Sequence, residues 1–284
     1  MIGVVFALLS AIGYGVSDFV GGIASRRVAA LRVVLVSYPV AMVLLAALAF
    51  LFGGEVSTPA IVWGALCGIS QAFGVWWFYA ALAAGPMSVV SPLTAILVAG
   101  LPVGAGLVLG ERPSAIAYSG IALALVAIVL VSRDVRDETD EQATPHRFTK
   151  QVAWLTVGAG VAFGLNFVLI DQAPVEARLW PLVFARISAS ALVLVIATFT
   201  RHLAVPSGVP LKLAIAAGVI DTVSNVAMLL ALQASMLSLA SVLISLYPAG
   251  TVGLALVVLK ERVTRWQAIG MILALVSVAM IATG

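Results

Sequence analysis

Charged side chains are scarce in this sequence. Asp, Glu, Lys and Arg make up 10% of its 284 residues, whereas a soluble globular protein has about 25%. Hydrophobic residues make up 63%, and a water-soluble fold of this length cannot bury so much apolar surface. Most of the chain must therefore be surrounded by lipid, which predicts an integral membrane protein. The net charge of +3 is too small and too dispersed to indicate a nucleic-acid partner.

Cysteine and histidine are also rare. Cys67 is the single cysteine and lies in an apolar run, which predicts a small buried residue and no disulfide framework. The two histidines, His146 and His202, fall in polar loops, so we expect no metal site inside the apolar runs. The sequence has no phosphate-binding GxxxxGK[ST] loop and no midspan Lys or Arg to pair with a nucleophilic Ser. These absences argue against an enzyme, against direct use of ATP and against a cofactor.

Long apolar runs fill most of the chain. Ten of them can cross about 30 Å of hydrocarbon at about 1.5 Å per residue. They lack a two-residue alternation, and unpaired backbone groups are costly in lipid, so we expect helices rather than a β-barrel. The first run has no basic segment before it, which favours a membrane span over a cleaved signal peptide. The predicted spans are 2–24, 33–52, 60–83, 86–109, 113–132, 152–171, 179–199, 210–232, 235–259 and 263–283.

A polar segment, residues 133–151, separates two similar halves. When the chain is shifted by 150 residues, Gly68 superposes on Gly218 and Glu111-Arg112 on Glu261-Arg262. This internal similarity predicts an all-α integral membrane protein whose ten transmembrane helices form two five-helix repeats. The expected division is a first repeat 1–132, a linker 133–151 and a second repeat 152–284.

The basic residues indicate how the repeats are oriented. Five spans per repeat is an odd number, so the second repeat must enter the membrane inverted relative to the first. The positive-inside rule then places the linker in the cytoplasm and both termini outside, as expected for a bacterial-type cytoplasmic membrane. Inverted repeats are common in secondary transporters, which bind substrate near the midplane where the repeats meet. The loops on the linker side hold Arg26, Arg27, Arg32, Arg133, Arg136, Arg147, Lys150, Arg201, Lys212, Lys260, Arg262 and Arg265, against Arg112 and Arg178 on the other side.

Short motifs add a family resemblance that covers nearly the whole chain. The tracts 86–92 (PMSVVSP) and 238–241 (SLAS) lead into the two Glu-Arg pairs, and 13–19 (GYGVSDF) lies in the first span. They resemble the EamA family of the drug/metabolite transporter superfamily, and within it the YddG type of amino-acid exporter. The resemblance implies a ten-helix basket with a central cavity, and export from the cytoplasm by alternating access. The second half departs from the usual pattern because Tyr247-Pro248 does not align with Pro92.

Polar residues inside the spans are the candidate cavity residues, because such groups are expensive in lipid. Gln71 and Asp221 occupy matching positions of the third and eighth spans, and Asn225 lies one turn beyond Asp221. They either bind a polar substrate or join helices by hydrogen bonds, and for Asp221 the binding role is favoured. Tyr14 and Asn166 are further cavity candidates. Asp18, near the cytoplasmic end of the first span, suits a solvated or packing role at least as well.

Arg186 lies about two turns inside the seventh span. It can extend its guanidinium to the membrane surface, pair with a carboxylate, or bind a substrate carboxylate. For the second of these roles we expect Asp171, near the outer end of the sixth span, to be the partner. Trp77 and Tyr79 either stack on an aromatic ligand or pack in the core, and Ser91 is a further cavity candidate. Pro92, Pro102 and Pro248 are expected to kink their spans or act as hinges.

The leading hypothesis is a secondary transporter that exports amino acids, aromatic ones first by resemblance, and works as a monomer. A drug or metabolite exporter of the same build is the alternative, and a passive channel or membrane enzyme is a third. The expected partners are a small-molecule substrate and the lipid bilayer.

Overall fold

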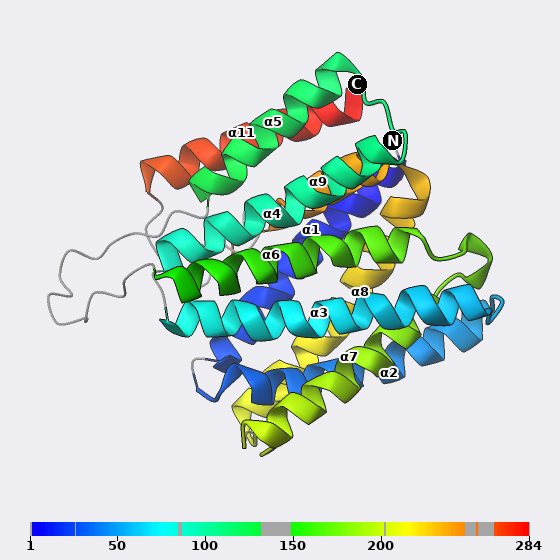
Figure 1. Cartoon of the computed structure of the whole chain (residues 1–284), viewed down its shortest axis with the longest axis vertical. Coiled ribbons are helices and arrows are strands. Elements are labelled where there is room, and N and C mark those ends of the chain that lie inside the picture. The colour runs from blue at the N-terminus through cyan, green and yellow to red at the C-terminus, as the bar shows by residue number, and fades with distance from the viewer. Residues whose placement is uncertain are drawn as a thin grey trace, which may run out of the picture.

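The computed structural model is a bundle of α-helices (Figure 1). It describes residues 2–25, 27–84, 87–131, 149–201, 203–247, 254 and 264–283, and among these no residue lies in a β-strand. The elements are α1 (Ile2–Ser25), α2 (Ala30–Phe52), α3 (Thr58–Ala84), α4 (Met87–Val108), α5 (Ala115–Val131), α6 (Lys150–Asp171), η1 (Val175–Ala177), α7 (Trp180–Phe199), α8 (Val209–Ala234), α9 (Leu237–Ile244) and α11 (Arg265–Thr283).

Polar residues and glycines define the ends of these helices. The Ser114 hydroxyl accepts a hydrogen bond from the Ala117 amide (3.1 Å) and begins α5. Thr264 and Gln267 form a capping box at the start of α11, with reciprocal bonds of 3.0 and 3.2 Å. Gly110, with φ of +99°, follows α4 and lets the chain turn sharply. The ends are therefore encoded locally, by residues outside the apolar runs.

Nine of the ten predicted spans coincide with these helices to within three residues. The ninth predicted span, 235–259, differs because α9 ends at Ile244. Pro248 has no amide N–H to bond the carbonyl of Ile244 four residues earlier, which agrees with the end of α9 at Ile244. Pro248 itself lies outside the described residues.

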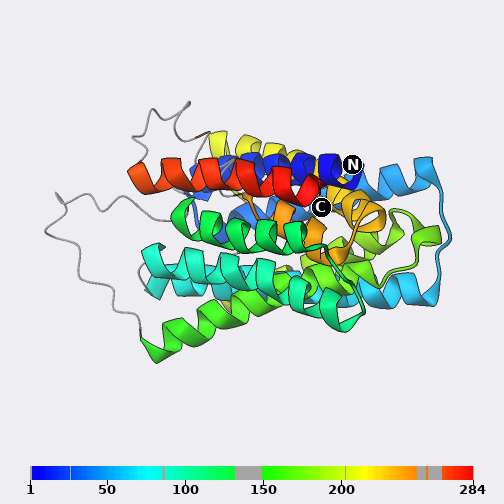
Figure 2. The same cartoon turned by 90° about the horizontal axis from the view of Figure 1, so that it is seen from above.

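The most extensive contacts between helices join the first half of the chain to the second. They come in matched sets: α1–α8 corresponds to α3–α6, α2–α8 to α3–α7, and α4–α6 to α1–α9. Three further extensive contacts, α2–α7, α4–α9 and α5–α11, each join a helix to its counterpart in the other half. Figures 1 and 2 show α5 and α11 side by side at one edge of the bundle.

Glycines at equivalent positions make two of these contacts close. A Cβ on Gly218 of α8 would lie 2.6 Å from the Ser37 carbonyl oxygen of α2. A Cβ on Gly68 of α3 would overlap the Ala185 carbonyl oxygen of α7. Backbone atoms cannot rotate away, so both contacts require glycine, as in other tightly packed membrane helices.

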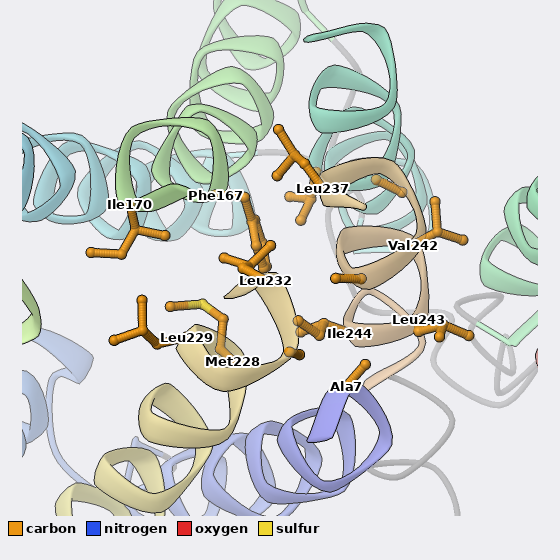
Figure 3. Packing of buried hydrophobic residues seen from close by; sticks show 14 of the residues in the cluster. Ala7, Phe167, Ile170, Met228, Leu229, Leu232, Leu237, Val242, Leu243 and Ile244 are labelled. Atoms are coloured by element: carbon orange, nitrogen blue, oxygen red, sulfur yellow. The ribbon is translucent and has the colours of Figure 1, made fainter. Parts of the chain in front are cut away.

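Apolar residues form a core where α1, α6, α8 and α9 meet (Figure 3). Phe167 and Ile170 of α6 point toward Met228 and Leu232 of α8 (Figure 3). The outer surface is apolar as well, with Leu51 77% and Phe199 84% exposed. Exposed apolar residues occur on many of the helices, which indicates that the outer faces of these helices contact lipid.

Within the part of the chain that the structure describes, six helices are long and apolar enough to cross a membrane: α1, α2, α3, α6, α7 and α8. Three shorter apolar stretches were found in the described residues, Ile96–Val108, Ala115–Leu130 and Arg265–Ile281. The chain is therefore a multi-pass helical membrane protein.

Both termini lie at one end of the bundle (Figures 1 and 2). At this end the Glu55 amide donates to the Glu176 carbonyl oxygen (3.0 Å), which joins the α2–α3 loop to the α6–α7 loop. The Glu111 carboxylate, after α4, accepts from the amides of Leu237 (2.5 Å) and Ser238 (3.0 Å) at the start of α9. Thus the acidic residue of the first Glu-Arg pair caps a helix of the second half, where the helix dipole favours an anion.

Candidate functional site

A buried charged cluster lies where α2, α3, α7 and α8 meet. Arg186 of α7 is only 1% exposed. Its guanidinium donates to Gln71 Oε1 of α3 (3.0 Å) and to Asp221 Oδ2 of α8 (2.5 Å). The ring of Tyr38 of α2 lies against the guanidinium, with 4.7 Å from Cζ to the ring centroid. This arrangement satisfies a buried cation with an anion, a neutral acceptor and an aromatic face.

The close helix contacts described above bring the cluster together. Gln71 follows Gly68 by three residues, and Asp221 follows Gly218 by three, so each polar residue is one turn beyond a close backbone contact. The glycine contacts hold α3 against α7 and α8 against α2. They place Gln71 and Asp221 on either side of Arg186, as the bonds show.

For Arg186 the expected partner is wrong, and one of its three alternative roles is disfavoured. Its ion-pair partner is Asp221 rather than Asp171. Asp171, at the end of α6, accepts instead from Gln172 Nε2 (3.3 Å). The guanidinium does not extend to the membrane surface either, because Arg186 belongs to the buried face of α7 and is almost completely enclosed.

Tyr14 and Asn225 lie beside the cluster. Asn225 is buried and its Nδ2 donates to the Asp221 backbone carbonyl (2.7 Å). The Tyr14 hydroxyl of α1 donates to Met228 Sδ (3.4 Å), and its ring lies within electrostatic range of Asp221 and Arg186. Of the predicted cavity residues, the structure thus brings together Tyr14, Gln71, Arg186, Asp221 and Asn225.

Asn166 and Trp77 lie elsewhere, in the contact between α3 and α6. Asn166 Nδ2 donates to the Cys67 carbonyl oxygen (3.1 Å), and the side chain is buried. The Trp77 ring covers Gly158, where an added Cβ would lie 2.9 Å from its Cε3 atom. These contacts favour the packing role for both residues.

The expected hinges are only partly covered by the structure. Pro102 is buried in α4, which runs uninterrupted from Met87 to Val108, and it lies near Gly164 of α6. The side chains of Tyr79, Ser91 and Pro92 and all of Pro248 lie outside the described part of the structure. In the part that is described, no three His, Cys, Asp or Glu residues are arranged to hold a metal ion.

Tyr38 is a member of the cluster that sequence reasoning did not single out. It precedes Arg186 by 148 residues, close to the 150-residue repeat. The glycine contacts show the same offset. Gly218 contacts Ser37 and Gly68 contacts Ala185, and Ser37 and Ala185 are also 148 residues apart. A repeat alignment that allowed a two-residue shift in the second and seventh spans would have paired Tyr38 with Arg186.

A multi-pass helical bundle with a charged cluster buried among its spans is typical of membrane proteins that move polar solutes. The sequence model of the EamA-like transporter family matches residues 1–133 and 150–283. The chain therefore belongs to the EamA-like transporter family, whose members are membrane transporters of the drug/metabolite type rather than enzymes.

Comparison with solved structures supports the fold. A crystal structure of another protein matches with a TM-score of 0.78 at 17% sequence identity, covering 99% of this chain and 96% of that one. At this identity the likeness concerns the fold alone. No curated protein matches the sequence.

Proposed function

We propose that this protein is a secondary transporter that exports small polar metabolites, with amino acids as the first substrates to test. The observation that carries the proposal is the Arg186–Asp221 ion pair, buried inside the membrane-spanning bundle. Ionisable groups inside a membrane are costly and usually belong to a solute or ion pathway. The pair belongs to the second half, and Arg186 also bonds Gln71 of the first half, so the cluster lies where the two halves meet. Transporters with inverted repeats bind substrate at such a contact.

The transport domain is proposed to be two inverted five-helix repeats, 1–132 and 152–284, joined by a cytoplasmic linker, 133–151. The matched helix contacts support this division, since exchanging the halves reproduces the set of most extensive contacts. Both termini lie at the same end of the bundle, which fits an orientation with the termini outside a bacterial-type cytoplasmic membrane. Because both repeats belong to one chain, a monomer contains the whole proposed pathway.

Substrate is proposed to bind on the side of the cluster formed by Tyr14 and Asp221. Arg186 is enclosed by its partners, whereas the Asp221 side chain retains 18% of its exposure. Tyr14 lies within electrostatic range of this carboxylate and its hydroxyl bonds Met228 of the same helix as Asp221. An aromatic residue and a carboxylate in one region suit an aromatic amino acid, the substrate type implied by the resemblance to YddG-type exporters. Access would alternate between the two sides of the membrane.

Counterflow in proteoliposomes tests the proposal. Vesicles loaded with unlabelled phenylalanine, threonine or a cationic dye are given labelled ligand, with and without a pH gradient. Accumulation of labelled phenylalanine that excess cold ligand abolishes would establish an amino-acid carrier, and the gradient would reveal proton coupling. Movement of the dye without an amino-acid signal would favour a drug or metabolite exporter. Non-saturable leakage would indicate a channel.

A further inference from the structure

Asp18 of α1 faces the interior of the bundle and is nevertheless exposed. It lies within the membrane span Ile2–Gly21. The lipid-facing side of α1 is marked by exposed apolar residues at helical spacing: Ile2, Val5, Leu9 and Ile12. Asp18 is on the opposite side, in line with the buried Ala7 and Ala11 and with Tyr14. Because Asp18 faces the other helices and is exposed, solvent can reach its carboxylate from the interior side of α1.

Among the residues that the structure describes, no cation pairs with this carboxylate. Across the described residues, Asp18 makes no hydrogen bond or ion pair, and the charge that acts on it most is Asp221. Asp221 is itself paired with Arg186, which is 1% exposed and bonded on two sides. Among the described residues, the Asp18 carboxylate therefore keeps an uncompensated negative charge, and the Arg186 guanidinium is enclosed by its own partners.

The geometry points to a site for a protonated amino group. We propose that the Asp18 carboxylate binds the ammonium group of the transported molecule. Tyr14 lies one turn away on the same helix face, where its ring can contact the cation. The proposal rests on the proposed transport function and narrows it, because a substrate then needs a protonated amine and does not need a carboxylate.

Three related ligands separate the charges of an aromatic amino acid. Phenethylammonium has only the cation, 3-phenylpropionate only the carboxylate, and phenylalanine has both. Each is titrated against the full-length protein in detergent, and the rise in melting temperature is followed as a function of ligand concentration. We expect phenethylammonium and phenylalanine to stabilise the wild type and 3-phenylpropionate not to do so.

The matched variants are Asp18→Asn and, as a control, Asp171→Asn, which makes the same change at the end of α6. We expect Asp18→Asn to weaken phenethylammonium binding by about 10- to 100-fold, the effect of losing one charge-assisted hydrogen bond. Asp171→Asn should leave the affinity unchanged. Unchanged affinity in Asp18→Asn, equal losses in both variants, or no stabilisation of the wild type by phenethylammonium would each overturn the inference.

The counterflow experiment separates this outcome from failure of the proposed function. If wild-type protein carries phenylalanine but 3-phenylpropionate competes as well as phenethylammonium, transport stands and the ammonium site is wrong. If phenethylammonium binds through Asp18 but no solute shows counterflow, the ammonium site stands and the proposed transport of amino acids is wrong.

Discussion

The ion pair inside the bundle allows a direct test of what holds α7 and α8 together. Asp221→Asn would leave the Arg186 guanidinium charged, because arginine does not lose its proton in proteins, and enclosed at 1% exposure. Removing one partner of a buried pair costs about 3–5 kcal/mol. At about 2–4 °C per kcal/mol for a chain of this size, the melting temperature should fall by roughly 6–20 °C.

The opposite variant should cost less. In Arg186→Met the remaining Asp221 carboxyl can take up a proton or reach water, since its side chain is 18% exposed. The double variant removes both charges, so it should be more stable than Asp221→Asn alone. The difference between the effect of the double variant and the sum of the two single effects then gives the interaction free energy of the Arg186–Asp221 pair.

Thermal unfolding in one detergent, followed by tryptophan fluorescence, is the measurement, and Asp171→Asn is the matched control. The control should stay within about 1 kcal/mol of the wild type, because Asp171 is half-buried and accepts one hydrogen bond, from Gln172, which asparagine can also accept. An Asp221→Asn protein that melts like the control would refute the reasoning. A double variant less stable than Asp221→Asn would do the same.

Three further predictions concern packing and capping. Gly68→Ala should lower the free energy of unfolding by about 1–3 kcal/mol because the added Cβ overlaps the α7 backbone. In the control Gly100→Ala the added Cβ has no atom within 4 Å, so the change should be neutral or slightly stabilising. Melting temperatures compare the two variants. Glu111→Gln should weaken the cap of α9 by about 0.5–2 kcal/mol, seen as faster hydrogen exchange at the Leu237 and Ser238 amides, and unchanged exchange there would contradict the cap. Asn166→Ala should cost roughly 0.6 kcal/mol with counterflow retained, and a loss of counterflow in a folded protein would show that Asn166 contacts substrate.

The helix positions could be read from the sequence because the boundaries are set by local signals. Apolar runs of sufficient length, ended by residues such as Gly110 and Ser114, predicted nine helices closely. The end of α9 was missed because the apolar run continues through Pro248, although proline chemistry there disfavours a helix. Hydropathy alone gives the length of an apolar run and takes no account of a proline within it.

The partners of Arg186 could not be read in the same way. In a membrane helix the face that meets lipid and the face that meets other helices are both apolar, so the pattern does not fix the rotation of α7. The 150-residue repeat correctly placed Gln71 and Asp221 at matching positions, and the structure joins both to Arg186. Choosing Asp171 instead followed from proximity along the membrane normal, which says nothing about the direction of the side chain.

The matched contacts have a consequence for how such a chain is assembled. The most extensive contacts of α1, α3 and α5 are with helices of the second half, so neither half is a self-contained unit. Residues 1–132 inserted alone would present to lipid the close-packing glycine Gly68 and the polar Gln71. With the proposed orientation, the partner that such a half needs is a second copy inserted upside down. Joining both orientations in one polypeptide fixes their ratio at one to one and removes the need for two copies to meet.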